Sequence, residues 1–259
     1  MEFFDKLETR DPAQREEQQF AQLRAQIANA QKNAPYAAHF LAGIDPAAIT
    51  DRAALAKLPV TRKANLIDLQ KARPPFAGMT AVPLAELGRV FMSPGPMFDP
   101  EGKRADYWRL ARAMFAAGFR AGELVHNTFS YHFTPAGFMA DMGAHALGCA
   151  VFPGGTGQTE MQVAAIVSLQ PQCYIGTPSF LRIILEKGIE LAADLSSVKK
   201  ALVSAEALPA SLRAWLNARG VFTLQCYASA DLGLIAYESP AQEGMLVDEG
   251  VLIELVRPG

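Results

Sequence analysis

The sequence predicts an α/β protein in which a mostly parallel sheet, with helices on both faces, follows an α-helical N-terminal segment. From Arg89 onward, short apolar runs typical of buried strands alternate with segments of helical periodicity, as in βαβ crossovers. Residues before about 80 carry helix signals only. Half of the 259 residues are apolar, which is enough for a sizeable core. We therefore expect a helical entry segment over 1–80 and an α/β domain over 81–259.

The entry segment begins with a long helix. Asp11 provides an N-cap, Pro12 occupies the first helical position, and apolar residues then recur at helical spacing until residue 33. Two further helices are expected over 52–58 and 62–72. A Thr or Asp stands where each of them begins, and prolines follow both.

The second part contains the strand-like runs and the helices between them. The expected strands are 88–93, 123–129, 149–153, 172–176, 199–205, 221–227 and 248–259. The expected helices are 104–118, 135–147, 158–169, 178–187 and 209–220. In parallel sheets, ligands bind outside the carboxyl ends of the strands. That rule selects six loops for attention, at 93–102, 130–137, 153–159, 176–179, 204–209 and 227–231.

Composition excludes several classes of protein. With 24 basic and 26 acidic side chains the net charge is −2, which disfavours nucleic-acid binding. No apolar run is long enough to span a membrane, and the N-terminus lacks a secretory pattern, so we expect a soluble cytoplasmic protein. The three cysteines are far apart and lie in apolar runs, where a thiol usually acts as a small hydrophobe. Neither a G-x-S-x-G elbow nor an H-E-x-x-H motif is present.

Two of the loops allow more than one interpretation. The PGGTGQT loop at 153–159 is either a tight strand–helix turn, which we favour, or an anion cradle at a helix N-terminus. It fits neither the Walker nor the dinucleotide glycine spacing. His132 is either a general base or pocket wall, or a histidine packed between Tyr131 and Phe133.

The roles of three carboxylates in other segments are also ambiguous. Asp141 and His145 share a helix face and are expected to form a local pair rather than a metal site. Asp231 follows a strand that ends at Tyr227, so a stacking ring and a Mg²⁺ ligand could lie together, although such a carboxylate is more often a solvated turn residue. Glu206 presents the same ambiguity before the helix expected at 209.

Taken in order, these loops resemble one family, the adenylate-forming acyl-CoA ligases, in their phenylacetate-CoA ligase-like branch. The resemblance begins at LPVTRKANLIDLQKARPPFAGM (58–79), which is similar to the branch's LP-[FVT]-T-x-K-x-x-L segment. It continues through PGGTGQTEMQ, GTPSFL, SAEALP and the tyrosine-led turn YASAD, and covers essentially the whole chain. It implies a reaction in which a carboxylate, ATP and Mg²⁺ give an acyl-adenylate, from which coenzyme A displaces AMP.

The resemblance also implies roles for individual residues. Asp231 takes the place of the Mg²⁺-binding glutamate and, with His132, is the expected catalytic residue. The residues expected to bind the nucleotide are Ser93, Gly95, Ser204, Ala205, Glu206, Tyr227, Ala228 and Ser229. The residues expected to bind the carboxylate substrate are Tyr131, Phe133, Gly176 and Thr177. Members of the branch are often dimers, so the resemblance also allows a homodimer.

Several positions depart from the family. Where the family's phosphate loop resembles S-S-G-T-T-G-K-P-T, residues 96–99 are Pro-Met-Phe-Asp, so a proline without an N–H and a carboxylate replace phosphate-binding groups. Ala228 and Ala230 replace a glycine and a threonine in the terminal turn. The sequence given reaches Gly259, before the family's ribose-binding aspartate and its small C-terminal domain with a catalytic lysine.

Three hypotheses result. The chain is an acyl-CoA ligase-like protein for an aryl or other apolar carboxylate, incomplete at its C-terminal side. Alternatively, it is a non-catalytic acyl- or nucleotide-binding module that has lost ATP chemistry. The third is an unrelated α/β protein whose loops match the family by chance.

Overall fold

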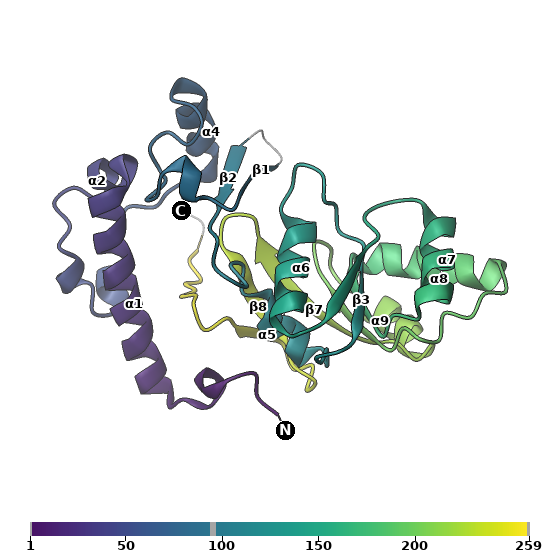
Figure 1. Cartoon of the computed structure of the whole chain (residues 1–259). Helices are drawn as coiled ribbons and strands as arrows, with labels where there is room; N and C mark the ends of the chain where they lie inside the picture. The colour runs from purple at the N-terminus through teal and green to yellow at the C-terminus, as the bar shows by residue number, and fades with distance from the viewer. Residues whose placement is uncertain (1, 94–96, 258–259) are drawn as a thin grey trace. The chain divides into compact units, whose positions relative to one another are not determined.

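The computed structural model describes residues 2–93 and 97–257 (Figure 1). The described chain forms two compact units. One contains residues 3–103 together with the segment that starts at Glu249, and the other contains Glu2 with residues 104–248. Apart from Glu2, the two units divide after Lys103 and after Asp248. The expected domain division at residue 80 stays a prediction.

The first unit is mainly helical, as the sequence predicts for its N-terminal part. Its helices are η1 (Lys6–Thr9), α1 (Pro12–Asn33), α2 (Pro35–Phe40), η2 (Pro46–Ala48), α3 (Arg52–Leu55), α4 (Lys63–Ala72) and η3 (Leu84–Glu86). The side chain of Asp11 caps α1 by accepting from the amides of Ala13 and Gln14. Phe20 and Ile27 from α1 pack with Ile49 in a small core to which Leu252 also contributes.

The segment after Asp248 is not the strand that its apolar pattern predicts. Residues 251–257 have no regular secondary structure and belong to the first unit. The Gln19 amide in α1 donates to the carbonyls of Glu249 (3.2 Å) and Val251 (3.3 Å). Arg15 pairs with the Glu249 carboxylate at 2.9 Å. Side chains of α1 therefore satisfy backbone groups that a sheet would otherwise pair.

The first unit also contains a β-hairpin of β1 (Arg89–Ser93) and β2 (Met97–Glu101). We expected β1, but we assigned residues 93–102 to a loop at the edge of the parallel sheet, and that prediction is wrong for residues 97–101, whereas residues 94–96 lie outside the described chain. Gln70 in α4 binds this strand as another strand would, since its amide oxygen accepts from Phe98 N (2.8 Å) and its amide nitrogen donates to Phe98 O (3.0 Å).

The second unit contains the predicted, mostly parallel sheet. Its strands are β3 (Leu124–Asn127), β4 (Ala150–Pro153), β5 (Cys173–Gly176), β6 (Lys200–Val203), β7 (Phe222–Ser229), β8 (Gly233–Glu238) and β9 (Met245–Val247). The strand order is β4-β3-β5-β6-β7-β8-β9. The first five are parallel, whereas β8 and β9 are antiparallel additions.

Helices cover both faces of this sheet. They are α5 (Leu110–Ala116), α6 (Ala136–Ala146), α7 (Thr159–Leu169), α8 (Pro178–Glu190) and α9 (Ala210–Asn217). His126 and Asn127 are adjacent in β3 and so point to opposite faces; His126 contacts α7, whereas Asn127 contacts α6. The core between sheet and helices on the α7 side includes Ile166, Tyr174, Leu181 and Leu216. The predicted fold class is confirmed.

The helix predicted over 104–118 is shorter than expected. Only Leu110–Ala116 is helical, because Asp106 and Arg109 adopt left-handed backbone angles (φ 43° and 63°). The carboxylate of Asp106 instead accepts from the amide of Ala111, in the first turn of α5 (3.2 Å).

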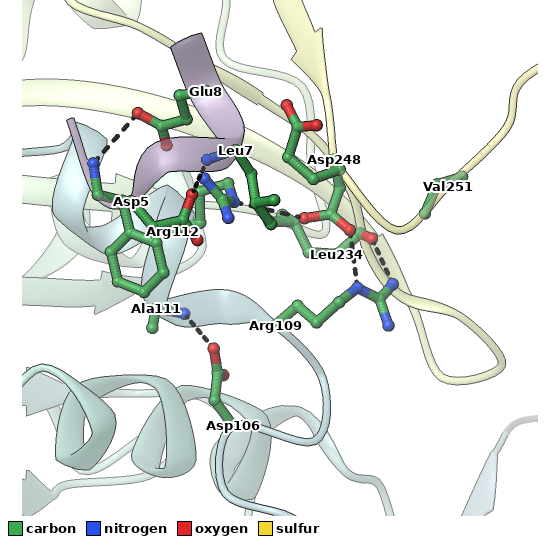
Figure 2. A network of polar contacts seen from close by, with 12 residues as sticks. Asp5, Leu7, Glu8, Asp106, Arg109, Ala111, Arg112, Leu234, Asp248 and Val251 are labelled. Atoms are coloured by element: carbon green, nitrogen blue, oxygen red, sulfur yellow. Dashed lines mark hydrogen bonds and ion pairs between the residues drawn. The ribbon is translucent and has the colours of Figure 1, made fainter. Parts of the chain in front are cut away.

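An ion-pair network lies next to this turn (Figure 2). The carboxylate of Asp248 is buried, with its side chain 2% exposed, and it accepts from Arg109 Nε at 2.7 Å. Arg112 Nε lies 3.9 Å from the other oxygen of the same carboxylate. Arg109 also donates to the carbonyls of Leu232 and Leu234, so the network connects the start of α5 to β8.

Candidate functional site

The order of the strands identifies where a ligand site is expected. The chain passes from β3 to β4 in one direction across the sheet, and then from β5 through β6 to β7 in the other. The connections that leave the neighbouring strands β3 and β5 therefore diverge. In open α/β sheets, ligands bind in the crevice outside the carboxyl ends of such a pair.

Hydrogen bonds connect the loops along this edge. Gly155 N, in the loop after β4, donates to Asn127 O at the end of β3 (3.0 Å), and Thr128 N donates to Ile175 O in β5 (2.9 Å). Ser204 N, after β6, donates to Gly176 O (3.1 Å), and its hydroxyl donates to Cys226 O in β7 (2.8 Å). Five of the six loops selected from the sequence therefore lie along one edge of the sheet.

The centre of this edge is a buried hydroxyl cluster. Thr128 donates to the Tyr174 hydroxyl at 2.7 Å, and that hydroxyl donates to Thr177 O at 3.3 Å. Burial, together with the nearby Glu206 carboxylate, raises the pKa of Tyr174 and keeps it protonated. A side chain at Gly176 would collide with this cluster, since a Cβ atom would lie 2.0 Å from Thr128 Oγ1.

Thr177 and Glu206, both expected to bind ligands, lie next to this cluster. The hydroxyl of Thr177 caps α8 by accepting from Phe180 N (3.3 Å). Glu206 is exposed and follows Ala205, whose φ of 68° turns the chain out of β6. The binding roles of these residues stay predictions.

A second cluster surrounds Tyr131. Its hydroxyl donates to Asp141 Oδ1 at 2.6 Å, and Asn127 Nδ2 donates to the same oxygen at 3.0 Å. Burial and the Asp141 carboxylate raise the pKa of Tyr131, so the phenol stays neutral. The predicted pairing of Asp141 with His145 is wrong, because Asp141 binds these partners and the His145 side chain is exposed.

His132 and Phe133 follow at the surface. The Ser130 hydroxyl accepts from His132 N (3.1 Å), but the His132 ring is exposed, which contradicts our interpretation of it as a packed histidine. Phe133 is 73% exposed and has a left-handed φ of 62°. An exposed phenylalanine in such a conformation is uncommon and is compatible with a binding role. Catalysis by His132 and substrate binding by Phe133 stay predictions.

The glycine-rich loop after β4 is held by Gln162 in α7. The amide of Gln162 donates to the carbonyls of Gly154 (3.0 Å), Gly155 (3.0 Å) and Gly157 (3.1 Å). Its oxygen lies 2.7 Å from His126 Nε2. The interpretation of residues 153–159 as a tight strand–helix turn fits this arrangement, although an anion-binding role is not tested by it.

His126 is buried under this loop, stacked between Phe152 (5.2 Å between ring centroids) and Tyr174 (6.5 Å). Because an amide oxygen only accepts, Nε2 carries the proton and Nδ1 is the bare nitrogen. Nδ1 has no hydrogen-bond partner among the described residues. Of the two ring nitrogens, only Nε2 therefore has a hydrogen-bond partner among the described residues.

Stability is expected to fall in acid because of His126. Burial lowers its pKa below the ordinary 6.5, so the unfolded chain binds a proton more readily than the folded one. The stabilisation that comes from keeping His126 neutral is complete above about pH 6.5. As the pH falls below this value, the free energy of unfolding decreases by at most about 1.4 kcal/mol per pH unit. Urea unfolding from about pH 7.5 to about pH 5 measures this.

His126→Phe is the control for this effect, since it keeps an aromatic ring in the stack and removes the titration. The difference between the two pH profiles isolates His126 from the carboxylates. Parallel profiles for the two proteins would contradict the prediction.

The Tyr227 turn is a β-hairpin rather than a loop after a strand. Strand β7 continues to Ser229, with a bulge between Tyr227 and Ala228, and pairs with β8. Ser229 Oγ accepts from Leu232 N (3.1 Å), which places the exposed Asp231 at the tip. Tyr227 is 59% exposed, so its ring is accessible for stacking. Nucleotide binding by Tyr227, Ala228 and Ser229, and Mg²⁺ binding by Asp231, stay predictions.

The remaining predicted residues belong to the first unit. Ser93 ends β1 and is buried, with its hydroxyl 3.5 Å from Met97 O. Gly95 lies outside the described residues. Within the described chain, no three His, Cys, Asp or Glu side chains gather to hold a metal ion, and no helix is both long and apolar enough to cross a membrane. The three cysteines are buried and free, and burial raises the pKa of Cys226 to about 12.

Comparison with known proteins agrees with this architecture. No protein-family model matches the chain. A phenylacetate-coenzyme A ligase from Aromatoleum evansii is 32% identical over 226 residues, which are 83% of this chain and 50% of that protein. The chain is a homologue of the phenylacetate-CoA ligases. Another, from Escherichia coli, is 30% identical over 241 residues, which are 88% of this chain and 54% of that protein.

The resemblance found in the sequence is thus confirmed, and the chain spans about half the length of these relatives. A solved 2-hydroxyisobutyryl-CoA ligase, crystallised with 2-HIB-AMP and CoA, superposes with a TM-score of 0.84 over 91% of this chain and 55% of its own. At 24% sequence identity, this likeness shows that the fold is shared. The sequence identity to the phenylacetate-CoA ligases excludes the third hypothesis, an unrelated α/β protein.

Proposed function

We propose that this chain supplies the acyl- and nucleotide-binding part of an acyl-CoA ligase. Its substrate would be an aryl or other apolar carboxylate, converted with ATP and Mg²⁺ to an acyl-adenylate and then to a thioester with coenzyme A. The observation that carries the proposal is the connected edge of five loops at the point where the strand order diverges. Homology to phenylacetate-CoA ligases over most of the chain supports it.

The residues present are suited to different parts of this task. The exposed ring of Tyr227 would stack on adenine, and Ser204, Ala205, Glu206, Ala228 and Ser229 would surround it. Mg²⁺ at nucleotides usually takes one or two protein carboxylates together with phosphate oxygens, and Asp231 would supply one. Tyr131, Phe133, Gly176 and Thr177 would line the acyl side, with His132 near the reacting groups. A homodimer is part of the same proposal.

One observation favours the alternative, a module that binds the acyl group or nucleotide without ATP chemistry. Residues 97–99, which stand in place of the family's Thr-Gly-Lys, belong to strand β2. The amide of Phe98 is already bound to Gln70, and Asp99 brings a buried carboxylate. A triphosphate at this segment would therefore meet neither a free Phe98 amide nor positive charge. Exchange of pyrophosphate into ATP, measured with and without aryl carboxylates, separates the two proposals.

Nucleotide binding is expected to raise the melting temperature. A ligand at about 100 times its Kd stabilises the folded state by about 2.7 kcal/mol, which corresponds to a rise of roughly 5–10 °C. Scanning fluorimetry with millimolar AMP or ATP and Mg²⁺ measures it. Tyr227→Ala should lose most of the shift, because its ring is exposed and its removal leaves the core intact.

Trp215→Phe, on α9, provides the matched aromatic control and should keep the full shift. The absence of any shift in the unmodified chain at saturating nucleotide would overturn the nucleotide site.

A further inference from the structure

A buried polar network lies behind the loop at 204–209. Glu238 in β8 is 6% exposed, and Nη2 of Arg213 in α9 donates to both of its carboxylate oxygens, at 2.7 and 2.9 Å. The same carboxylate accepts from Gln225 N (3.0 Å) and from Gln225 Nε2 (2.8 Å). Arg213 also donates to Thr223 O at 2.7 Å. One carboxylate therefore fixes both the backbone and the side chain of Gln225.

The fixed amide of Gln225 reaches the loop. Its oxygen accepts from Leu208 N at 3.3 Å, near the end of the loop, whereas Ser204 at the beginning donates to Cys226 O. Gln225 also pairs across the sheet with Val203, the last residue of β6. The loop is thus attached at both ends to consecutive residues of β7, immediately before Tyr227. Glu206 stands between the two attachments.

We infer that Gln225, oriented by the Glu238–Arg213 pair, is a positioning residue that fixes the 204–209 loop relative to Tyr227 for nucleotide binding. The amide group of a glutamine side chain rotates freely unless its nitrogen and its oxygen are both hydrogen-bonded. Glu238 binds the nitrogen of this one, so the oxygen is directed at Leu208. The 204–209 loop and Tyr227, which form the two halves of the expected adenine site, are then both held in place by strand β7. This inference rests on the proposed function.

Gln225→Met is the variant that tests the inference. It keeps the volume of the side chain, the backbone bond to Glu238 and the Arg213 ion pair, and it removes only the amide. Val221→Ala, a core change directly before the same strand, is the matched control for a general loss of stability. Both are measured well below their melting temperatures, by hydrogen exchange of the loop amides and by titration with a fluorescent AMP analogue.

Gln225→Met should speed exchange of the 204–208 amides by about tenfold and weaken nucleotide binding by about tenfold, the size of one lost hydrogen bond to a fixed partner. Val221→Ala should change neither by more than about twofold. In a second test, Gln225→Glu combined with Glu238→Gln exchanges the amide and the carboxylate, and it should recover much of the protection that each single change loses.

The outcomes are distinguishable. Unchanged exchange in Gln225→Met overturns the inference, and so does faster exchange with unchanged nucleotide affinity. Equal effects in Val221→Ala also overturn it, because they would make the network a general structural element. If the unmodified chain binds no nucleotide, the proposed function fails first. The exchange data would then still report whether Gln225 holds the loop.

Discussion

Gly176→Ala is expected to destabilise the protein by about 3 kcal/mol or more, because the new methyl group overpacks a buried site and breaks its hydrogen bonds. The added Cβ would lie 2.0 Å from Thr128 Oγ1 and 2.5 Å from the Tyr174 hydroxyl. Both side chains are buried and bound to one another, so neither can move without losing a partner. A fall in melting temperature of roughly 10 °C would accompany this loss.

Two variants test the cause of this effect. Gly220→Ala has space around its methyl group but a left-handed φ of 78°, so it should lose only the backbone term of about 1–2 kcal/mol. Adding Thr128→Ala to Gly176→Ala removes the closest atom and should recover part of the loss. Urea midpoints measure all three. If Gly176→Ala were no worse than Gly220→Ala, steric exclusion at Gly176 would be wrong.

Asp248→Asn is expected to lose about 3–5 kcal/mol, the usual result of removing one partner from a buried ion pair. The change keeps the shape of the side chain but leaves Arg109 and Arg112 facing a neutral amide (Figure 2). Because Arg109 also binds the carbonyls of Leu232 and Leu234, the start of β8 should loosen. Chemical unfolding measures the loss, and hydrogen exchange of β8 locates it.

The control for Asp248 is Asp194→Asn. Asp194 accepts from Ser196 N at the surface, and an asparagine oxygen can do the same, so the change should leave the free energy of unfolding nearly unchanged. A loss in Asp248→Asn below about 1 kcal/mol, typical of exposed pairs, would show that the network is not a buried one.

Much of the fold could be predicted because local signals and burial agree. Parallel strands are buried on both faces, so β3, β5 and β6 appear in the sequence as short apolar runs bounded by turns. The errors fall where distant contacts decide. The 248–259 segment has a strand-like pattern, but α1 side chains bind its backbone. Residues 97–101 look like a loop and pair with β1 instead. The antiparallel strand β8 was missed, although GLIAYE is an apolar run.

Only part of the candidate site could be predicted from the sequence. Loops could be selected because the carboxyl ends of parallel strands share an edge, and five of them are connected there. The residues that hold them together, among them Asn127, Gln162 and Gln225, were not singled out. Each is a polar residue within or beside an apolar run. That signal was available, but which partner satisfies each amide depends on strand order, which single-sequence patterns do not determine.

The docking of residues 249–253 on α1 has a consequence for biosynthesis. At about 5–20 residues per second, roughly 12–46 s separate the synthesis of Gln19 in α1 from that of Glu249, to which it binds. During this interval the N-terminal helices expose the apolar side chains against which Leu252 packs, among them Phe20 and Ile27. The packing of these helices is therefore completed only by a peptide made 230 residues after Gln19.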